Sequence, residues 1–598
     1  MATHCMHNLP FGAEIIAPGL TRFRLWAPDK QNIELVIEGR SPIAMQRNDS
    51  GLFESEVDCG EGTRYRFHVG DRLLVPDPAS RLQSGDVHDP SIVFDPRRYR
   101  WSHPHWRGRL WPEMVIYELH VGSLGGFDQV RYKLAELASL GITAIELMPI
   151  ADFRGTRNWG YDGVLPFAPD ASYGSPDQLK QLIDTAHGLG LCVYLDVVYN
   201  HFGPDGNYLH CYASSFFDPD KNSPWGAAID FSNPWVREFF IQNALYWLQE
   251  YRFDGLRLDA VHQISDPGWI DELAHRVRST IAPGRHVHLM LENEHNRSSH
   301  LDNGVDAQWN DDGHNVLHVM LTGESVGYYQ DFVEIPAQKL ARCLAEGFIF
   351  QGEPAQSQKG EPRGSRSAHL PPHAFILFLQ NHDQIGNRAF GERLITLTDT
   401  ARLRAAIMLQ LLAPQIPLLF MGEEWGCRTP FLYFTDFHDE LATAVRNGRQ
   451  QEFASQPAFS DPKKRAQIPD PNAERTFTDS IPTAETNAQE AKRYLAYYRK
   501  LLGLRRQYIV PRLAGCRSLG ALVLNDATVS AEWLLDDGSV LRIITNLDNR
   551  AQPLSPELTQ GTLLADSGTL WNTHGSDAGT DRIPGQTTRV YLQTNQLP

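Results

Sequence analysis

Short apolar segments alternate with segments of helical spacing from about residue 112 to residue 422, and this alternation limits the fold more than any other feature. The strand candidates are 114–121, 143–150, 191–199, 254–259, 287–292, 306–310, 374–380 and 417–422. Because these segments are apolar on both faces, they are typical of buried parallel strands. Eight such strands, each followed by a segment long enough for a helix, predict an α/β fold with a (β/α)8 TIM barrel.

Helical patterns separate most of the predicted strands. They cover 127–140, 176–188, 234–250, 268–280, 336–346 and 399–412, and a last helix is expected at 486–508. Two connections, 201–233 after strand three and 424–485 after strand eight, are longer than a βα loop requires. The segment 353–371 is polar and rich in Gly and Pro, which predicts a mobile loop before strand seven.

Short β-type runs separated by Gly, Asp and Pro occur on both sides of the predicted barrel. They predict three domains: an N-terminal β-sandwich at 1–98, the barrel at 99–511 and a C-terminal β-sandwich at 512–598. Four aromatic residues of the first domain could form a platform for a sugar or could belong to its core. These residues are Phe23, Trp26, Tyr65 and Phe67.

The charge and the cysteines disfavour several classes of function. The chain has 598 residues and a formal net charge of −17, which disfavours nucleic acid or an anionic membrane as partner. Seven scattered cysteines without a CxxC pair predict neither a disulfide framework nor a zinc site, and they favour a reducing compartment. The sequence MATHCMHNLPFG lacks a signal-peptide pattern, and no apolar segment is expected to span a bilayer. We therefore expect a cytoplasmic protein.

Polar and charged residues stand where the predicted strands end. In GLRLDAVH, Arg257 and Asp259 are two positions apart, so both should lie on one face of strand four. The active sites of (β/α)8 barrels lie at the C-terminal ends of the strands, so residues from several strands should meet there. The candidates are Asp196, Asn200, His201, Arg257, Asp259, His262, Glu292, Asp311, Asp312, His314, His382, Asp383, Asn387, Glu423 and Glu424.

Several carboxylates at one barrel mouth are costly to desolvate unless they have a function. Cleavage of a glycosidic bond needs at least two carboxyl groups, one ionised and one protonated. Arg257 should favour the ionised form of Asp259, which makes Asp259 the candidate nucleophile. Glu292 follows an apolar run and is less obviously paired with a cation, so it is the candidate acid.

Each of these signals also has a purely structural interpretation. Taken alone, Arg257 and Asp259 could equally form an ion pair inside the barrel. His201 and His382 could be core histidines, and the group at the end of strand three could be a metal cluster, although the ligand spacing of a zinc or EF-hand site is absent. The aromatic residues Trp159, Tyr161, Trp225, Tyr328 and Tyr329 could serve packing alone.

The segments DVVYNH, GLRLDAVH, LENEHN and QNHDQIGN resemble, in this order and at these spacings, the four signature regions of the α-amylase superfamily of glycoside hydrolases. The resemblance extends over nearly the whole chain. It implies that Asp259 is the nucleophile, Glu292 the general acid/base and Asp383 a third carboxylate that grips sugar hydroxyls. The implied mechanism is retaining and passes through a covalent glycosyl-enzyme. The resemblance also suggests sugar contacts from Tyr161, Asp196, His201, Arg257 and His382. We add further candidate substrate-binding residues: His262, Asp311, Asp312, His314, Gln384 and Asn387.

Further segments, among them NWGYDGV, WNDDGHN and LTGESVGYYQDF, resemble one family of this superfamily, the maltooligosyltrehalose trehalohydrolases. The resemblance implies hydrolysis of the α-1,4 bond between a maltooligosyl chain and a terminal trehalose, in sequence with a maltooligosyltrehalose synthase. It places Trp225 and Tyr328 on the trehalose side of the cleft. It implies no cofactor, and we expect no metal.

Three alternatives remain at the level of sequence. A glycogen branching enzyme would transfer the chain to a sugar hydroxyl instead of water, and a debranching enzyme would share the four regions. The LTGE…GYY and WNDDGH segments argue against both. A glycan-binding relative without activity is also conceivable, but Asp259, Glu292 and Asp383 are all present. A second glutamate, Glu294, follows strand five, and we prefer Glu292 because it stands directly at the strand end.

Overall fold

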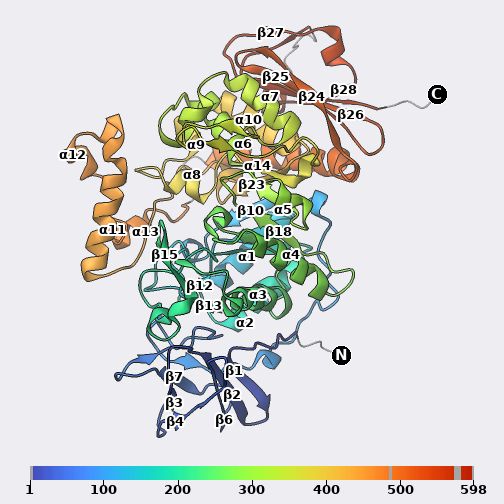
Figure 1. Cartoon of the computed structure of the whole chain (residues 1–598). Helices are drawn as coiled ribbons and strands as arrows, with labels where there is room; N and C mark the ends of the chain where they lie inside the picture. The colour runs from blue at the N-terminus through green and yellow to red at the C-terminus, as the bar shows by residue number, and fades with distance from the viewer. Residues whose placement is uncertain (1–4, 484–487, 572–580, 595–598) are drawn as a thin grey trace.

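The chain forms a central barrel between two regions of β-sheet (Figure 1) in a computed structural model that describes residues 5–483, 488–571 and 581–594. The N-terminal sheets, drawn in blue, lie at the bottom of Figure 1, and the C-terminal sheets, drawn in red, lie at the top. The barrel therefore contacts one β-sheet region at each end of the molecule.

Eight parallel strands form the closed barrel, which confirms the predicted (β/α)8 fold. They are β10 (Ile116–Leu119), β11 (Ala144–Leu147), β14 (Cys192–Val197), β17 (Gly255–Leu258), β18 (His288–Leu291), β19 (Ala307–Trp309), β22 (Phe375–Leu377) and β23 (Ile416–Phe420). Pairing of β23 with β10 closes the ring. Each strand overlaps one of the predicted segments, because burial on both faces made each of them apolar.

The predicted helices also form. They are α1 (Phe127–Leu140), α2 (Pro176–Gly188), α3 (Pro234–Gln249), α4 (Gly268–Thr280), α7 (Pro336–Glu346), α10 (Thr400–Leu412) and α14 (Ala488–Leu504). Local sequence fixes their starts: Ser175 forms a capping box with Gln178 at α2, and Asn233 caps α3, with a proline following each cap. Other described helices were not predicted. One of them, α6 (Asp311–Thr322), starts directly after β19, where the sequence indicated only a cluster of polar residues.

The segment 353–371 does not form the simple loop that its composition predicted. It contains a short hairpin of β20 (Glu353–Pro354) and β21 (Pro362–Arg363). Arg363 is buried, and its Nη1 lies 2.9 Å from the Asp312 carboxylate. The Asp331 carboxylate accepts hydrogen bonds from the backbone N–H groups of Gln356 and Ser357. These contacts come from residues distant in sequence, so composition could not reveal them.

The N-terminal region is a sandwich of two antiparallel sheets. One has the order β1 (Gly12–Ala17), β2 (Leu20–Trp26), β6 (Leu52–Asp58) and β5 (Gln46–Arg47), and the other has β4 (Ile43–Ala44), β3 (Glu34–Ile37), β7 (Arg64–His68) and β8 (Leu74–Val75), with β9 (Ser91–Ile92) beside β7. Phe23, Tyr65 and Phe67 are buried in its core, and Trp26 stacks on Trp235 of α3 at 5.7 Å. The four aromatic residues therefore serve packing, and not a sugar platform.

The C-terminal region also has two sheets. The larger has the order β24 (Arg517–Asn525), β25 (Thr528–Leu534), β26 (Val540–Asn546), β30 (Thr587–Gln593) and β28 (Thr562–Asp566), and β27 (Gln552–Pro553) pairs with β29 (Arg582–Ile583). The three predicted domain boundaries stay a prediction.

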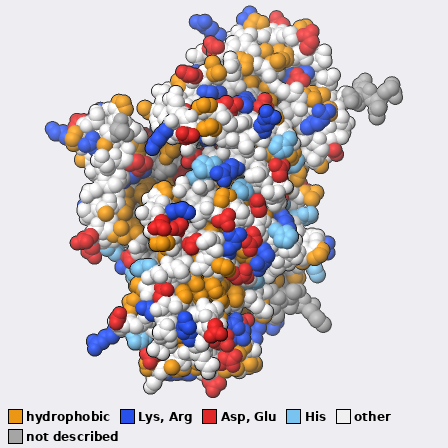
Figure 2. All heavy atoms as spheres, in the orientation of Figure 1, with side chains coloured by type: hydrophobic (Ala, Val, Ile, Leu, Met, Phe, Trp, Pro, Cys, Tyr) orange, Lys and Arg blue, Asp and Glu red, His pale blue; other side chains and the backbone are white. Residues whose placement is uncertain are grey.

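The long segment after β23 builds a projection from α11 (Asp439–Glu452) and α12 (Pro462–Arg465), seen at the left of Figure 1. The surface is hollowed between this projection and the barrel (Figure 2). None of the described helices combines the length and apolar composition needed to cross a bilayer. All seven cysteines are free thiols, and the described residues contain no group of three His, Cys, Asp or Glu side chains arranged to hold a metal ion.

Candidate active site

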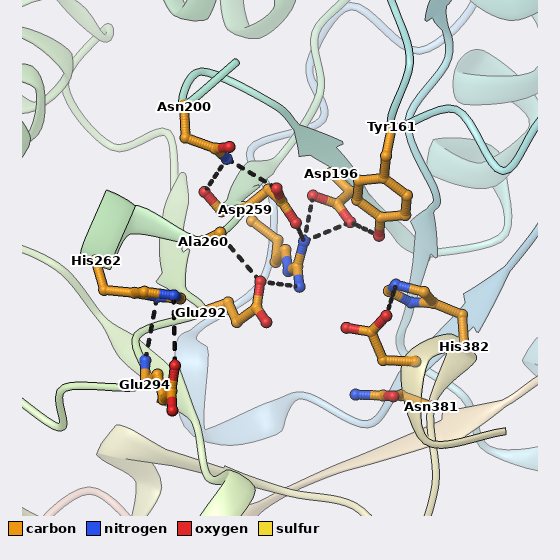
Figure 3. A network of polar contacts seen from close by, with 12 residues as sticks. Tyr161, Asp196, Asn200, Asp259, Ala260, His262, Glu292, Glu294, Asn381 and His382 are labelled. Atoms are coloured by element: carbon orange, nitrogen blue, oxygen red, sulfur yellow. Dashed lines mark hydrogen bonds and ion pairs between the residues drawn. The ribbon is translucent and has the colours of Figure 1, made fainter. Parts of the chain in front are cut away.

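One buried guanidinium joins carboxylates from three strands (Figure 3). Nη1 of Arg257 lies 2.8 Å from Asp196 Oδ2 and 2.8 Å from Asp259 Oδ1, and Nη2 lies 2.8 Å from Glu292 Oε2. Arg257 is inaccessible to solvent, and its guanidinium carbon lies 4.1 Å from the centre of the Trp309 ring. The sequence left open whether Arg257 and Asp259 form a structural ion pair or part of a functional site. In the structure, Arg257 pairs with three carboxylates and not with Asp259 alone.

Glu292 is less obviously paired than Asp259 in the sequence, but in the structure it pairs with the same Arg257 guanidinium. In addition to Arg257, the backbone N–H of Ala260 donates to Glu292 Oε2 at 2.9 Å. Ala260 has a φ of 39°, a left-handed conformation that is unfavourable for alanine and directs this N–H toward Glu292. Glu294, the alternative acid, instead lies 3.7 Å from His262 and is partly exposed.

Both carboxylate oxygens of Asp259 have partners. Oδ1 faces Arg257, and Oδ2 accepts a hydrogen bond of 2.8 Å from Asn200 Nδ2, which also donates to the Asp259 carbonyl. The residue is 8% exposed, so its carboxylate is held in place but keeps a small solvent-accessible surface. Asn200 was noted at the end of strand three but was not among the predicted contact residues.

Tyr161 connects two parts of the site. Its hydroxyl donates to Asp196 Oδ2 at 2.6 Å, and its ring stacks on His382 at 5.0 Å between centroids. Burial raises the pKa of Asp196 to about 7, although the Arg257 charge opposes this shift. The tyrosine therefore brings the Arg257 cluster and the strand-seven residues together.

Asp383 stands at the start of α8 (His382–Gly386), just beyond β22. Its Oδ1 accepts a hydrogen bond of 3.1 Å from Asn387 and lies 3.4 Å from His382 Nε2. Burial raises the pKa of Asp383, and the His382 charge opposes this effect. Gln384 is held through its backbone N–H by the Asn381 side chain.

Two aromatic residues expected on the trehalose side are exposed. Trp225, 47% exposed, lies between β15 (Phe217–Ser223) and β16 (Gly226–Ile229) and stacks on His201 at 4.6 Å. Burial lowers the pKa of His201 to about 4, so this ring is neutral at pH 7. Tyr328 is 69% exposed in the segment Gly327–Phe332.

The residues after strand six have mainly internal contacts. The Asp312 carboxylate accepts hydrogen bonds from Asn296 and from the backbone of Ile349 and Phe350. His314 is buried, with Nδ1 2.8 Å from the Leu379 carbonyl. These contacts do not join Asp312 and His314 to the Arg257 cluster. Burial raises the pKa of Asp311 well above its usual range.

Two buried glutamates at this end of the barrel were missed. Glu118 is the third residue of β10, and Glu146 is its register partner on β11. Glu118 accepts hydrogen bonds from Nδ1 and from the backbone N–H of His382. The rule that found the other residues, a charged side chain at the end of a predicted strand, passed over both, because they lie inside the predicted strands 114–121 and 143–150; a single charge within an apolar segment was the available signal.

Comparison with known proteins agrees with this architecture. The family "Alpha amylase, catalytic domain" matches residues 96–227, and a domain family of unknown function, DUF3459, matches 516–590. The malto-oligosyltrehalose trehalohydrolase of Deinococcus radiodurans is 41% identical over 81% of each chain. This chain belongs to the maltooligosyltrehalose trehalohydrolase family.

Other similarities fit membership of the trehalohydrolase family. A Salmonella typhimurium protein, solved as a candidate α-amylase, superposes with a TM-score of 0.91 at 42% identity, over 98% of this chain and 100% of that chain. A 1,4-α-glucan branching enzyme of Bacillus caldolyticus is 34% identical, but over only 42% of this chain and 43% of its own. The similarity to the trehalohydrolase thus covers about twice as much of the chain as the similarity to the branching enzyme.

Proposed function

We propose that this protein is a retaining glycoside hydrolase that cleaves the α-1,4 bond between a maltooligosyl chain and the terminal trehalose of maltooligosyltrehalose, with release of trehalose. The observation that carries this proposal is the binding of Asp259 and Glu292 to the two terminal nitrogens of one guanidinium, that of Arg257. Retaining enzymes need their two carboxyl groups about 5–5.5 Å apart, and attachment to one guanidinium keeps the two groups close together.

In the first step, Asp259 attacks the anomeric carbon while Glu292 donates its proton to the glycosidic oxygen, and trehalose leaves. Arg257 and Asn200 hold the Asp259 carboxylate in a fixed position. Asp383, supported by Asn387, binds sugar hydroxyls and favours the distorted ring of the transition state.

In the second step, Glu292 accepts a proton from water, and the water attacks the same anomeric carbon from the face that trehalose left. The bond to Asp259 breaks, and the maltooligosaccharide leaves with its anomeric configuration retained. No step requires a metal or a cofactor. Tyr161, Asp196, His201 and His382 are the proposed contacts of the sugar before the cleaved bond, and Trp225 and Tyr328 those of trehalose.

The substrate must come from an enzyme that converts the reducing end of a maltooligosaccharide into a trehalose unit. We therefore expect this protein to act in sequence with a maltooligosyltrehalose synthase in the cytoplasm. A neutral glucan suits a chain with a formal net charge of −17, which would repel polyanions.

The test is incubation with maltohexaosyltrehalose and, separately, with amylose. We expect free trehalose from the first substrate and no new branch points from the second. Branch points from amylose without trehalose from maltohexaosyltrehalose would favour the branching enzyme, the alternative that the partial similarity leaves. The anomers distinguish mechanisms: the α-anomer of maltohexaose should appear first in the proton NMR spectrum, whereas first appearance of the β-anomer contradicts retention.

A further inference from the structure

We infer that Glu118 is a positioning residue that keeps His382 as an imidazolium, so that Nε2 of His382 presents an N–H to Asp383 and to the sugar. This inference rests on the proposed function, because it assigns the proton state of one residue of that site. Glu118 itself lies behind His382 and does not reach the cleft: it is 1% exposed.

The contacts of His382 define its proton positions. Nδ1 donates to Glu118 Oε1, and the backbone N–H of His382 donates to Glu118 Oε2 at 3.1 Å. On the other side of the ring, Nε2 lies 3.4 Å from Asp383 Oδ1. A neutral ring with its proton on Nδ1 would direct a lone pair at this carboxylate. Only the imidazolium donates on both sides.

The surrounding rings hold His382 in this orientation. Tyr161 stacks on the imidazole at 5.0 Å, and Trp159 contacts it edge-on at 5.4 Å. The histidine is 1% exposed, so water cannot replace Glu118 as the acceptor for Nδ1. A buried charge of this kind needs a paired opposite charge, and Glu118 supplies it.

Two acids lie next to the His382 ring, Glu118 at Nδ1 and Asp383 at Nε2. Further ionisable groups around it are Arg257 on β17, Asp196 on β14, Glu146 on β11 and His120 after β10. Burial raises the pKa of Glu146 well above its usual range, and neither of its oxygens has a partner among the described residues. Glu146 is therefore the uncharged member of the β10–β11 pair.

Burial alone would lower the pKa of His382, but the Glu118 and Asp383 charges raise it to about 9. The imidazolium is thus retained below this pH and lost as the pH rises through it. In Glu118→Gln, burial and the Arg257 charge remain while the main opposing charge is gone. The pKa of His382 should fall by about 1–3 units, as expected for loss of an adjacent opposite charge.

The experiment measures kcat/KM against pH for fluoride release from α-maltotriosyl fluoride. Because fluoride leaves without protonation, deprotonation of Glu292 does not obscure the fall of kcat/KM at the alkaline side of the pH profile, called here the alkaline limb. We expect this limb near pH 9 in the wild type and about 1–3 pH units lower in E118Q. The matched control is E424Q, another buried glutamate, which bonds Tyr117 instead of His382; its limb should stay at the wild-type position.

An E118Q limb at the wild-type position overturns the inference, and so does an equal shift in E424Q. If E118Q does not fold, Glu118→Asp retains the charge but withdraws it from Nδ1, and a smaller shift in the same direction is expected; an unchanged limb then contradicts the inference. In E146Q the limb should not move, because an uncharged acid is replaced by an uncharged amide. Failure of the wild type to release fluoride at all would instead overturn the proposed function.

Discussion

At the scale of single residues, the site depends on the shape of Arg257 as well as on its charge. Nη1 serves Asp196 and Asp259, and Nη2 serves Glu292. A lysine at this position would provide one point charge and could not hold carboxylates on two sides. We expect R257K to lower kcat/KM by about 10²–10³-fold, comparable to the loss of one preorganised donor.

The control for R257K is R475K, at an arginine whose side chain is 88% exposed. This control should have wild-type kinetics. Activity of R257K within a few-fold of wild type would show that the two-sided geometry of Arg257 is not needed.

A second prediction at this scale separates Glu292 from Glu294. E292Q should lower kcat on maltohexaosyltrehalose by about 10²–10⁴-fold, because the leaving oxygen is no longer protonated. It should release fluoride from α-maltotriosyl fluoride in a first turnover, because fluoride needs no proton. E294Q is the matched control variant, and it should still protonate the leaving oxygen of maltohexaosyltrehalose. The reverse pattern, with E294Q defective and E292Q active, would move the acid to Glu294.

The sequence was sufficient for part of this site, and the reason is periodicity. Residues two apart on a strand share a face, which placed Arg257 beside Asp259. The bond from Arg257 to Glu292 could not be predicted in the same way. It depends on the register between β17 and β18, in which Arg257 lies opposite Met290 and so brings Glu292 to the rim. Register across a barrel is a tertiary property.

At the scale of elements, a buried ion pair is one of the contacts that attach the β20–β21 hairpin to the barrel. Arg363 pairs with Asp312 at 2.9 Å and donates from Nε to the Glu294 carbonyl. R363M would leave Asp312 buried without its cation, which costs about 3–5 kcal/mol. We expect a lower Tm and faster hydrogen exchange at the amides of Ile349 and Phe350, which donate to Asp312.

The double variant R363M/D312N tests the cause. It should recover part of the Tm lost in R363M, because no unpaired charge remains. R342M is the control at a partly exposed arginine of the same region, which pairs with Glu353. Equal loss in R342M and R363M would show that burial of the pair does not matter.

Asp312 and Arg363 are 51 positions apart, so the polar composition of 353–371 indicated a loop and could not indicate its attachment.

At the scale of the whole molecule, the N-terminal sandwich is held against the barrel by aromatic packing. Trp26 stacks on Trp235 of α3 at 5.7 Å, and Phe11 contacts the same ring edge-on at 6.0 Å. We expect W26A to reduce the free energy of unfolding by about 3–5 kcal/mol and to lower Tm. The conservative variant W26F should lose much less. A Tm of W26A equal to that of wild type would contradict this role.

The order of the three regions could be predicted from the sequence, because β-sandwiches and (β/α)8 barrels differ in the length and spacing of their apolar segments. The sequence could not decide whether Phe23 and Trp26 serve packing or sugar binding, since both uses need aromatic side chains. Only burial decides between them: Phe23 is buried in the core of the sandwich beside Tyr65, and Trp26 is covered where the sandwich contacts α3.

The most direct test of the central claim is the identification of the covalent glycosyl-enzyme. In E292Q supplied with α-maltotriosyl fluoride, the first step should proceed, and the second should be slow because the base that activates water is missing. Mass spectrometry of the quenched and digested protein should find one maltotriosyl group on the peptide that contains Asp259. An adduct on Asp383 or on another residue, or steady turnover without any adduct, would contradict the account.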